Sequence, residues 1–375
     1  MSNSPKVLFV MAGMFLAAFI VASVSGEHRF AGWLLMGFFA STAIGFRYFE
    51  LLKGYSYTIT ILAAASMAMY YPSYFISVGD FKLSRLITPL LQIIMFGMGT
   101  SLSWRDFAAV VRMPKGVIAG VLCHYTIMPF VAFIITAIFS FPPEIAAGII
   151  LVGSCPNGLA SNVMTYLAKA NLALSVTLTA ISTFMAPFVT PMFMQWLGGQ
   201  YVEVDTMKML LDIVYITIIP IVAGLIFNHF LHGKFKVLDS IMPLLSMGGI
   251  ALIIVVITAN GRDNLLAVGP LLVVAVLMHN VSGYILGYWS SKWLLKMPEV
   301  DCRTIAIEVG LQNAGLASGL ANAMGKMSTV GLAAAVFGPV MNITGSTLAL
   351  WFRSKPIQES SLEKNTSIPS AHERA

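Results

Sequence analysis

One acidic side chain inside an apolar segment is the feature of this sequence that most directly predicts chemistry. Glu308 lies in residues 303–325, a segment that is otherwise apolar enough to cross a membrane. A carboxylate at that depth costs about 2.5–3.5 kcal/mol unless it faces a polar cavity or a cation. Residues that weaken a helix or add polarity follow it: Gly310, Gln312, Asn313 and Gly315. Many ion-coupled transporters build a cation site from a helix broken in this way. The alternatives for Glu308 are a buried protonated carboxyl and a pair with Arg303.

A second polar interruption occurs in the apolar segment 145–168, at residues 153–162 (GSCPNGLASN). Pro156 removes an amide donor and clashes with the preceding turn, and the glycines add flexibility. In a bilayer the backbone groups freed by such a break need partners, so breaks occur where protein or a watery cavity covers them. The freed carbonyls suit a hard cation, and the freed N–H groups at a helix start suit an anion.

The helix expected after this interruption presents a row of hydroxyls. Ser175 and Thr179 are four residues apart and therefore share one helical face. With Ser161, Asn162 and Glu308 they make an oxygen set with one negative charge. Such a set suits a monovalent cation better than Ca²⁺, because Ca²⁺ recruits more carboxylates. The alternative for any one hydroxyl is a bond to a carbonyl one turn back in its own helix.

Motifs for enzymatic chemistry do not occur in the sequence. It contains no GxxxxGK[ST] phosphate loop and no HExxH zinc motif, and its six histidines show no metal-binding spacing. Cys123, Cys155 and Cys302 lie in or beside apolar segments, where they are expected to pack as small residues. His279 and Asn280 lie inside an apolar segment and are expected to hydrogen-bond between helices. The sequence therefore argues against an enzyme.

The elements that must position these residues are membrane-spanning helices. The chain of 375 residues is 58% hydrophobic and 10% charged, with a mean hydropathy of +0.83, whereas soluble domains carry about 25% charged residues. A span needs about 20 mostly apolar residues. This criterion predicts an all-α polytopic protein with twelve spans, at residues 7–24, 31–49, 55–75, 84–101, 116–139, 145–168, 171–197, 206–230, 239–260, 265–290, 303–325 and 329–352.

The basic residues support an even number of spans. The net charge of +6 is scattered among loops, which argues against nucleic-acid binding and fits the charge bias of cytoplasmic loops. With both termini cytoplasmic, fourteen of the 22 Lys and Arg residues fall on the cytoplasmic side, two fall in the tail, and six fall outside: Arg29, Lys82, Arg85, Lys208, Arg262 and Lys326. We therefore expect a multi-pass protein in the lipid of the cell membrane, with both termini cytoplasmic.

A repeated tetrapeptide indicates that the chain has two related halves. The tetrapeptide Gly-Leu-Ala-Ser begins at residue 158 and again at residue 315, and in each case the next span contains a proline. If residues 55–197 and 206–352 are units of five spans each, the odd count inverts the second unit and brings two broken helices together near a pseudo-twofold axis. The predicted domains are then residues 1–50, an additional two-helix segment; residues 51–353, the transporter domain; and residues 354–375, a disordered cytoplasmic tail.

Several stretches resemble the bile acid:sodium symporter family. Residues 154–168 (SCPNGLASNVMTYLA) and 172–179 (LALSVTLT) resemble its first signature, residues 308–317 (EVGLQNAGLA) resemble its second, and residues 95–99 (MFGMG) fit its pattern. The resemblance covers residues 55–353 and indicates a bacterial-type member. It implies a ten-helix core in which a panel domain packs against a core domain that holds two crossing, broken helices.

The resemblance also implies two sodium sites and a substrate site. One sodium site would use the side chains of Ser161, Asn162, Ser175, Thr179 and Glu308. The other would use the Glu308 and Gln312 side chains, the carbonyls of Val309 and Leu311, and a glutamine from a neighbouring helix. The substrate, an organic anion, would lie beside the crossing, near Asn157, Gly158, Leu159, Ala160 and Asn313.

Two positions depart from the family pattern. Alignment on residues 127–129 places His124 where the family has that glutamine. A neutral imidazole could coordinate sodium, whereas a protonated one would repel it, and histidine titrates near pH ~6.5 when unperturbed. We expect either a weakened, pH-dependent second site that contains His124, or a His124 that faces elsewhere. The family also commonly has Gly-Gly-Thr where this chain has Asn157-Gly158-Leu159, so a hydroxyl beside the substrate is lost.

The expected function is sodium-coupled symport of an organic anion by alternating access. The anion would be bile-acid-like or a small carboxylate such as pantoate or pyruvate. The alternative is a proton-coupled or uncoupled carrier in which Glu308 is the protonatable site. A membrane-embedded sensor that uses the same pocket is less favoured, because the tail after residue 353 is too short for a signalling domain.

Overall fold

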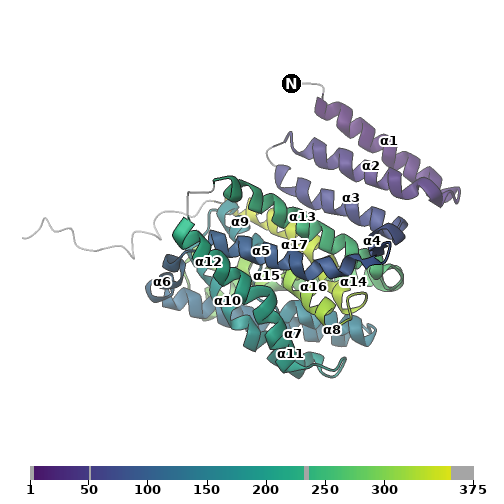
Figure 1. Ribbon diagram of the computed structural model, residues 1–375. Coiled ribbons are helices and arrows are strands. Elements are labelled where there is room, and N and C mark those ends of the chain that lie inside the picture. The colour runs from purple at the N-terminus through teal and green to yellow at the C-terminus, as the bar shows by residue number, and fades with distance from the viewer. Residues whose placement is uncertain (1–3, 50–51, 232–235, 356–375) are drawn as a thin grey trace, which may run out of the picture.

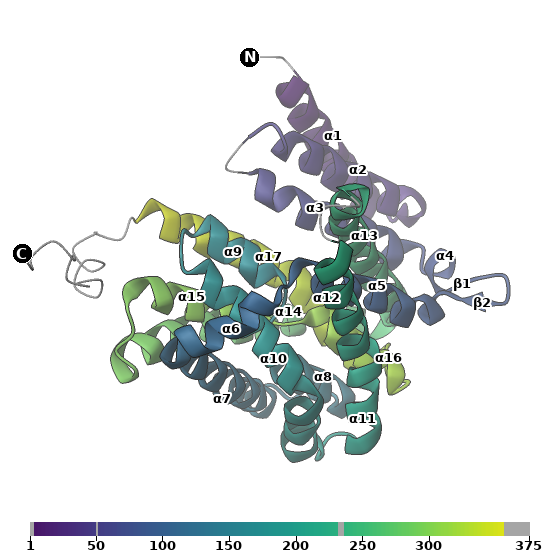
Figure 2. The same ribbon diagram turned by 60° about the vertical axis from the view of Figure 1, so that its left-hand side comes forward.

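The computed structural model describes residues 4–49, 52–231 and 236–355. The tail predicted to be disordered therefore lies outside the described residues from residue 356 onward. Nearly all the regular structure in the described residues is helical. One short antiparallel pair, β1 (Ser77–Val78) and β2 (Phe81–Lys82), projects from the helices as a hairpin (Figure 2).

Three N-terminal helices form a stack at one edge of the molecule. They are α1 (Ser4–Val24), α2 (His28–Phe46) and α3 (Ser56–Tyr70), and they lie side by side in chain order (Figure 1). Gly32 lets α2 approach α3, because a Cβ at that position would lie 2.5 Å from the Cβ of Tyr70. Residues 1–50, predicted to stand outside the repeat, therefore include a helix, α2, that packs directly on α3, the first helix of the predicted repeat.

The remaining helices form the body of the molecule. They are α4 (Ser73–Ile76), α5 (Ile87–Ser101), α6 (Trp104–Arg112), α7 (Pro114–Ile138), α8 (Pro143–Ser154), α9 (Ala160–Leu167), α10 (Leu172–Phe193), α11 (Thr206–Ile213), α12 (Ile219–Leu231), α13 (Lys236–Asn260), α14 (Arg262–Trp289), α15 (Glu299–Gly310), α16 (Ala314–Ala323) and α17 (Val330–Ser354). Short 3₁₀ turns cover Lys53–Tyr55 and Leu83–Leu86, and π-helical turns cover Met194–Gly198, Val214–Ile218 and Ser290–Leu294.

Each of the twelve predicted spans coincides with one helix or with consecutive helices. The two spans that contain polar interruptions are each split, into α8 and α9 and into α15 and α16. Within the described residues, seven helices are long and apolar enough to cross a membrane, and shorter apolar helices accompany them. The chain is thus an all-helical, polytopic membrane protein, and the count of twelve spans stays a prediction. Helix α6 and the β1–β2 pair were not predicted from the sequence.

The body contains two groups of helices. In one, α5 packs against α12 and α13, and α13 also contacts α3; in the other, α7, α8, α10, α14, α15 and α17 pack together (Figure 2). Glycines set the closest approaches. A Cβ on Gly99 of α5 would lie 2.1 Å from the carbonyl oxygen of Ile221, and one on Gly224 of α12 would lie 2.2 Å from that of Phe96. Small residues at such crossings let helix backbones touch within a membrane.

The crossing of α5 and α12 yields a stability prediction. Gly99→Ala should lower the melting temperature, because its methyl group must push against backbone, and overpacking of this kind costs about 1–3 kcal/mol. The matched control is Gly248→Ala in α13, where a Cβ would meet nothing within 4 Å. The measurement is thermal unfolding of both purified variants in detergent; equal melting temperatures would contradict the close crossing.

Candidate functional site

The first break is stabilised by groups from two neighbouring helices. Helix α8 ends at Ser154, ahead of Pro156, and α9 begins at Ala160. The Ser154 carbonyl accepts a hydrogen bond from Thr190 Oγ1 of α10 at 2.8 Å, and the Cys155 carbonyl pairs with His124 Nε2 of α7 at 3.0 Å. Backbone acceptors freed by the break are therefore satisfied inside the protein, as a bilayer setting requires.

The second break has the same kind of support. Helix α15 ends at Gly310, whose carbonyl accepts from Asn280 Nδ2 of α14 at 2.8 Å. The Asn280 Oδ1 atom in turn accepts from Thr344 Oγ1 of α17. The neighbouring His279 pairs through Nε2 with the Met128 carbonyl of α7 at 3.0 Å. The prediction that His279 and Asn280 hydrogen-bond between helices is confirmed.

The two breaks pair with each other. The Asn313 amide donates to the Pro156 carbonyl at 2.9 Å, and the Gly158 amide donates to the Leu311 carbonyl at 3.0 Å. These bonds form a short antiparallel bridge between Asn157 and Gln312. A Cβ on Gly158 would lie 2.6 Å from the Gln312 carbonyl oxygen, so this approach requires glycine. The broken helices meet where their helical hydrogen bonding stops.

Glu308 lies at this meeting point together with the first predicted oxygen set. Its carboxylate accepts hydrogen bonds from Ser175 Oγ and, at 3.2 Å, from Thr179 Oγ1. Both hydroxyls also reach Asn162 Oδ1, at 2.8 and 3.3 Å, and Ser161 Oγ lies 3.3 Å from Thr179 Oγ1. Four of the five residues have no exposed surface, and Asn162 is partly exposed. The structure therefore brings all five predicted residues together.

The charge of Glu308 has no basic partner in the described part of the chain, where the ion pairs involve other acids. Arg303 instead pairs with Glu299 at 3.0 Å and donates to the Phe352 and Lys355 carbonyls. The alternative that Glu308 pairs with Arg303 is therefore wrong. A buried carboxylate surrounded by oxygens fits a cation, because the hydroxyls can rotate to present lone pairs in place of protons.

The second predicted set contains two acceptors that lack donors. Gln312 Nε2 donates to the Val309 carbonyl at 2.7 Å, but Gln312 Oε1 is buried with no hydrogen-bond partner in the described structure. The Nε2 atom of His124 faces a carbonyl, so in a neutral imidazole it carries the proton and Nδ1 holds the lone pair. That Nδ1 is likewise buried without a partner in the described structure, and so is Nδ1 of His279, which no predicted set contains. Orphaned acceptors fit a cation, since buried polar groups normally have partners.

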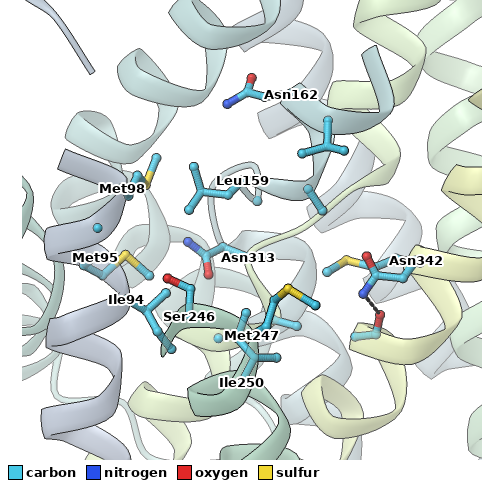
Figure 3. A pocket seen from close by; sticks show the side chains of 18 of the residues that line it. Ile94, Met95, Met98, Leu159, Asn162, Ser246, Met247, Ile250, Asn313 and Asn342 are labelled. Atoms are coloured by element: carbon cyan, nitrogen blue, oxygen red, sulfur yellow. Dashed lines mark hydrogen bonds between the residues drawn. The ribbon is translucent and has the colours of Figure 1, made fainter. Parts of the chain in front are cut away.

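A cavity of about 760 Å³ lies beside the crossing and contains most of the predicted substrate residues. Gly158, Leu159, Ala160 and Asn313 line it, and Figure 3 shows Leu159 and Asn313 near its centre. Asn157 is placed differently. It is only 2% exposed, it is not among the lining residues, and its amide donates to the Glu308 carboxylate.

Helices distant in the sequence supply the opposite walls of this cavity (Figure 3). These residues were not predicted from the sequence; they include Met95 and Met98 of α5, Ser246 and Ile250 of α13, and Asn342 of α17. Most are apolar side chains with no chemical mark that separates them from lipid-facing ones. The only signal nearby was the glycine pattern of residues 95–99, which marked the segment but not its role.

No Lys, Arg, Asp or Glu occurs among the described residues that line the cavity. Its polar character comes from amides, hydroxyls and the starts of two helices. Helix α9 begins at Ala160 and α16 at Ala314, both of them lining residues, and Asn313 caps α16 by accepting from the Leu316 amide at 3.0 Å. Helix N-termini carry partial positive charge and attract anions. The cavity therefore suits a mainly apolar ligand that bears a negative group.

Comparison with known proteins agrees with this geometry. The model of the Sodium Bile acid symporter family matches residues 88–268. The chain is also 40% identical over 316 residues to the uncharacterized sodium-dependent transporter YocS of Bacillus subtilis, covering 84% of this chain and 96% of that protein. The chain belongs to the sodium bile acid symporter family. It is therefore a membrane transporter and not an enzyme.

Two plant proteins extend the family comparison. The probable chloroplastic sodium/metabolite cotransporter BASS1 of Arabidopsis thaliana is 36% identical over 269 residues, which are 72% of this chain and 67% of that protein. The probable chloroplastic sodium/metabolite cotransporter BASS2 of Oryza sativa subsp. japonica is 33% identical over 270 residues, which are 72% of this chain and 64% of that protein. The similarity thus extends well beyond the two breaks.

The oxygen set yields a binding prediction. Ser175→Ala should raise the sodium concentration needed for half-maximal thermal stabilisation by about tenfold or more, because contacts to a charged group are worth about 1.5–3 kcal/mol. The control is Ser182→Ala on the same helix, since within the described residues Ser182 Oγ bonds to the Thr179 carbonyl, at 3.2 Å, and not to Glu308. Titration of NaCl against choline chloride measures both variants. An equal response from the two would argue against this cation site.

Proposed function

We propose that this transporter carries an organic anion together with sodium, by alternating access, across the cell membrane. The observation that carries the proposal is the buried Glu308 carboxylate, surrounded by Ser161, Asn162, Ser175 and Thr179 with no basic partner in the described chain. The relatives named as sodium-dependent or sodium/metabolite transporters support the choice of cation. Each sodium ion that enters with a membrane potential of 100 mV contributes about 2.3 kcal/mol.

The proposal includes two sodium ions that share Glu308. The first is held by the five-residue oxygen set. The second is held by Glu308, Gln312 and His124, with the carbonyls of Val309 and Leu311. The unpartnered Gln312 Oε1 and His124 Nδ1 atoms support this second assignment, because each is an acceptor aimed at no donor in the described structure.

The substrate is proposed to occupy the cavity beside the crossing. Its negative group would lie against the starts of α9 and α16, near Ala160 and Asn313, and its apolar part against the methionine-rich wall formed with α5. The volume of about 760 Å³ falls within the 300–1,000 Å³ typical of small-molecule sites. Both substrate classes remain in the proposal, bile-acid-like anions and small carboxylates such as pantoate or pyruvate.

The inverted repeat is proposed as the basis of alternating access. Its support is that a side chain of the preceding long helix hydrogen-bonds to a carbonyl at each break: His124 of α7 to that of Cys155, and Asn280 of α14 to that of Gly310. In chain order, helices α7, α8, α9 and α10 would correspond to α14, α15, α16 and α17. The group that contains α5, α12 and α13 would move against the group that contains the crossing, with both chain termini in the cytoplasm.

Transport in proteoliposomes tests the function directly. An inward sodium gradient should drive uptake of labelled pantoate, pyruvate or cholate, whereas choline should not. Glu308→Gln, which keeps the shape but removes the charge, should abolish this sodium-driven uptake. Equal uptake in choline, driven by an acidic exterior, would instead establish the proton-coupled alternative with Glu308 as the protonatable group.

His124 yields a prediction on pH. Acidification through the titration of the imidazole should weaken the sodium response of the wild type, because an imidazolium at the second site repels sodium. His124→Gln, which keeps an acceptor but cannot gain charge, should remove this dependence. His279→Gln is the matched control, because His279 is also buried and also holds a backbone carbonyl. Sodium titrations at several pH values measure all three proteins; an unchanged profile in His124→Gln would mean that His124 is not a ligand.

A further inference from the structure

Asn157 lies at the centre of the crossing and has no direct access to the cavity. Its chain neighbours make the two backbone bonds that join the breaks, Pro156 to Asn313 and Gly158 to Leu311. Its side chain is 2% exposed and does not line the cavity. A role in substrate contact therefore does not account for its polar side chain, and its hydrogen bonds point elsewhere.

Both hydrogen bonds recorded for the Asn157 amide go to the same residue. Nδ2 donates to Glu308 Oε2 at 2.6 Å and to the Glu308 main-chain carbonyl at 2.9 Å. Because an ionised carboxylate and a carbonyl are acceptors only, chemistry fixes which end of the amide faces Glu308. The amide thus joins the first break to α15 through two bonds that no apolar side chain could make.

The two oxygens of the Glu308 carboxylate differ in their nearest neighbour, while the Thr179 hydroxyl lies 3.4 Å from Oε1 and 3.2 Å from Oε2. Oε1 has its shortest bond from Ser175, whose hydroxyl can turn to offer a lone pair to a cation. Oε2 has its shortest bond from Asn157, whose NH₂ group is a donor with no lone pair to offer. The amide therefore supplies partial positive charge to a buried anion that has no basic partner in the described chain.

We propose that Asn157 is a positioning residue that stands in for a cation at Glu308 when the transporter is empty. Its bond to Oε2 is strongest while the carboxylate carries its full charge and weakens once sodium shares that charge. The amide then favours the empty state over the loaded state and lowers the affinity for sodium. This inference rests on the proposed sodium coupling, and it deepens it by naming what satisfies Glu308 between cycles.

The proposal has a mechanistic reason. A symporter that has released its ions must return empty, and a bare carboxylate in a low-dielectric interior opposes that step. One N–H of the Asn157 amide donates to the carboxylate and reduces this cost, while the bond to the Glu308 main-chain carbonyl holds the amide in place. No charged side chain that would compete permanently with sodium is added. The same donor makes release easier, since sodium leaves a carboxylate that already has a partner.

The test compares Asn157→Ala with the wild type by titrating NaCl against choline chloride at constant ionic strength and following the melting temperature. Asn157→Ala should lower stability without sodium. It should also reduce the sodium concentration at half-maximal stabilisation by about three- to tenfold, which is the size expected for a bond to a charged group. A merely structural role would lower the melting temperature at every sodium concentration and leave the half-maximal concentration unchanged.

Two further variants complete the test. Asn280→Ala removes another buried amide that holds a carbonyl at the crossing but does not touch Glu308, so its half-maximal sodium concentration should equal that of the wild type. Asn157→Asp places a second carboxylate against Glu308 and should show a larger sodium-induced rise than Asn157→Ala. If Asn157→Ala does not fold, Asn157→Asp tests the proposal instead. Folding of Asn157→Asp that depends on sodium supports the proposal, and failure of Asn157→Asp to fold at any sodium concentration overturns it.

The remaining outcomes are separable. A weaker or unchanged sodium affinity in Asn157→Ala, with a normal wild-type response, overturns the role of Asn157 and leaves sodium coupling intact. No sodium response in the wild type overturns the proposed coupling itself, and this inference with it.

Discussion

A buried negative charge without a basic partner is the constraint on which the rest of this structure depends. Glu308 is fully buried, and in the described chain only hydroxyl and amide groups donate to its carboxylate. Such a charge is tolerated only when its oxygens are well bonded or a cation is at hand. That requirement explains why α10 turns a row of hydroxyls towards the crossing, and why the second helix must break just after the acid, where its carbonyls become available.

Breaking two helices inside a membrane creates a second requirement, and the neighbouring helices meet it. The carbonyls at the ends of α8 and α15 are held by side chains of α7, α10 and α14: His124, Thr190 and Asn280. The unwound segments then use each other, through the bridge between Asn157 and Gln312. Backbone that pairs in this way is rigid enough to hold oxygens in place, yet only a few hydrogen bonds join the two halves.

Much of this arrangement could be predicted from the sequence, because polar residues are rare in apolar segments and carry information there. Glu308, Pro156 and the spacing of Ser175 and Thr179 indicated both breaks and the oxygen set, and the structure places those residues together. The walls that α5 and α13 contribute could not be predicted, since Met95 or Ile250 looks like any lipid-facing residue until packing is known. Asn157 shows the other limit. The family resemblance implied a substrate contact for it, but the direction of its side chain depends on an antiparallel pairing with residues 311–313 that sequence spacing does not encode.

Two residues belong to the proposed cation sets and also line the cavity, and they would give the proposed coupling a physical route. Asn162 Oδ1 lies 2.8 and 3.3 Å from the hydroxyl oxygens of Ser175 and Thr179, and Asn162 also lines the cavity. Gln312 belongs to the second proposed set and lines the cavity as well. Because the described lining residues include no charged side chain, the charge of the proposed anionic substrate would be balanced by helix N-termini and by whatever lies behind these two amides. A cation there would orient both amides and add positive potential at the cavity wall, and so would raise the affinity for the anion. Thermodynamic reciprocity then requires the anion to raise the affinity for the cation by the same factor, which is the property that a symporter needs.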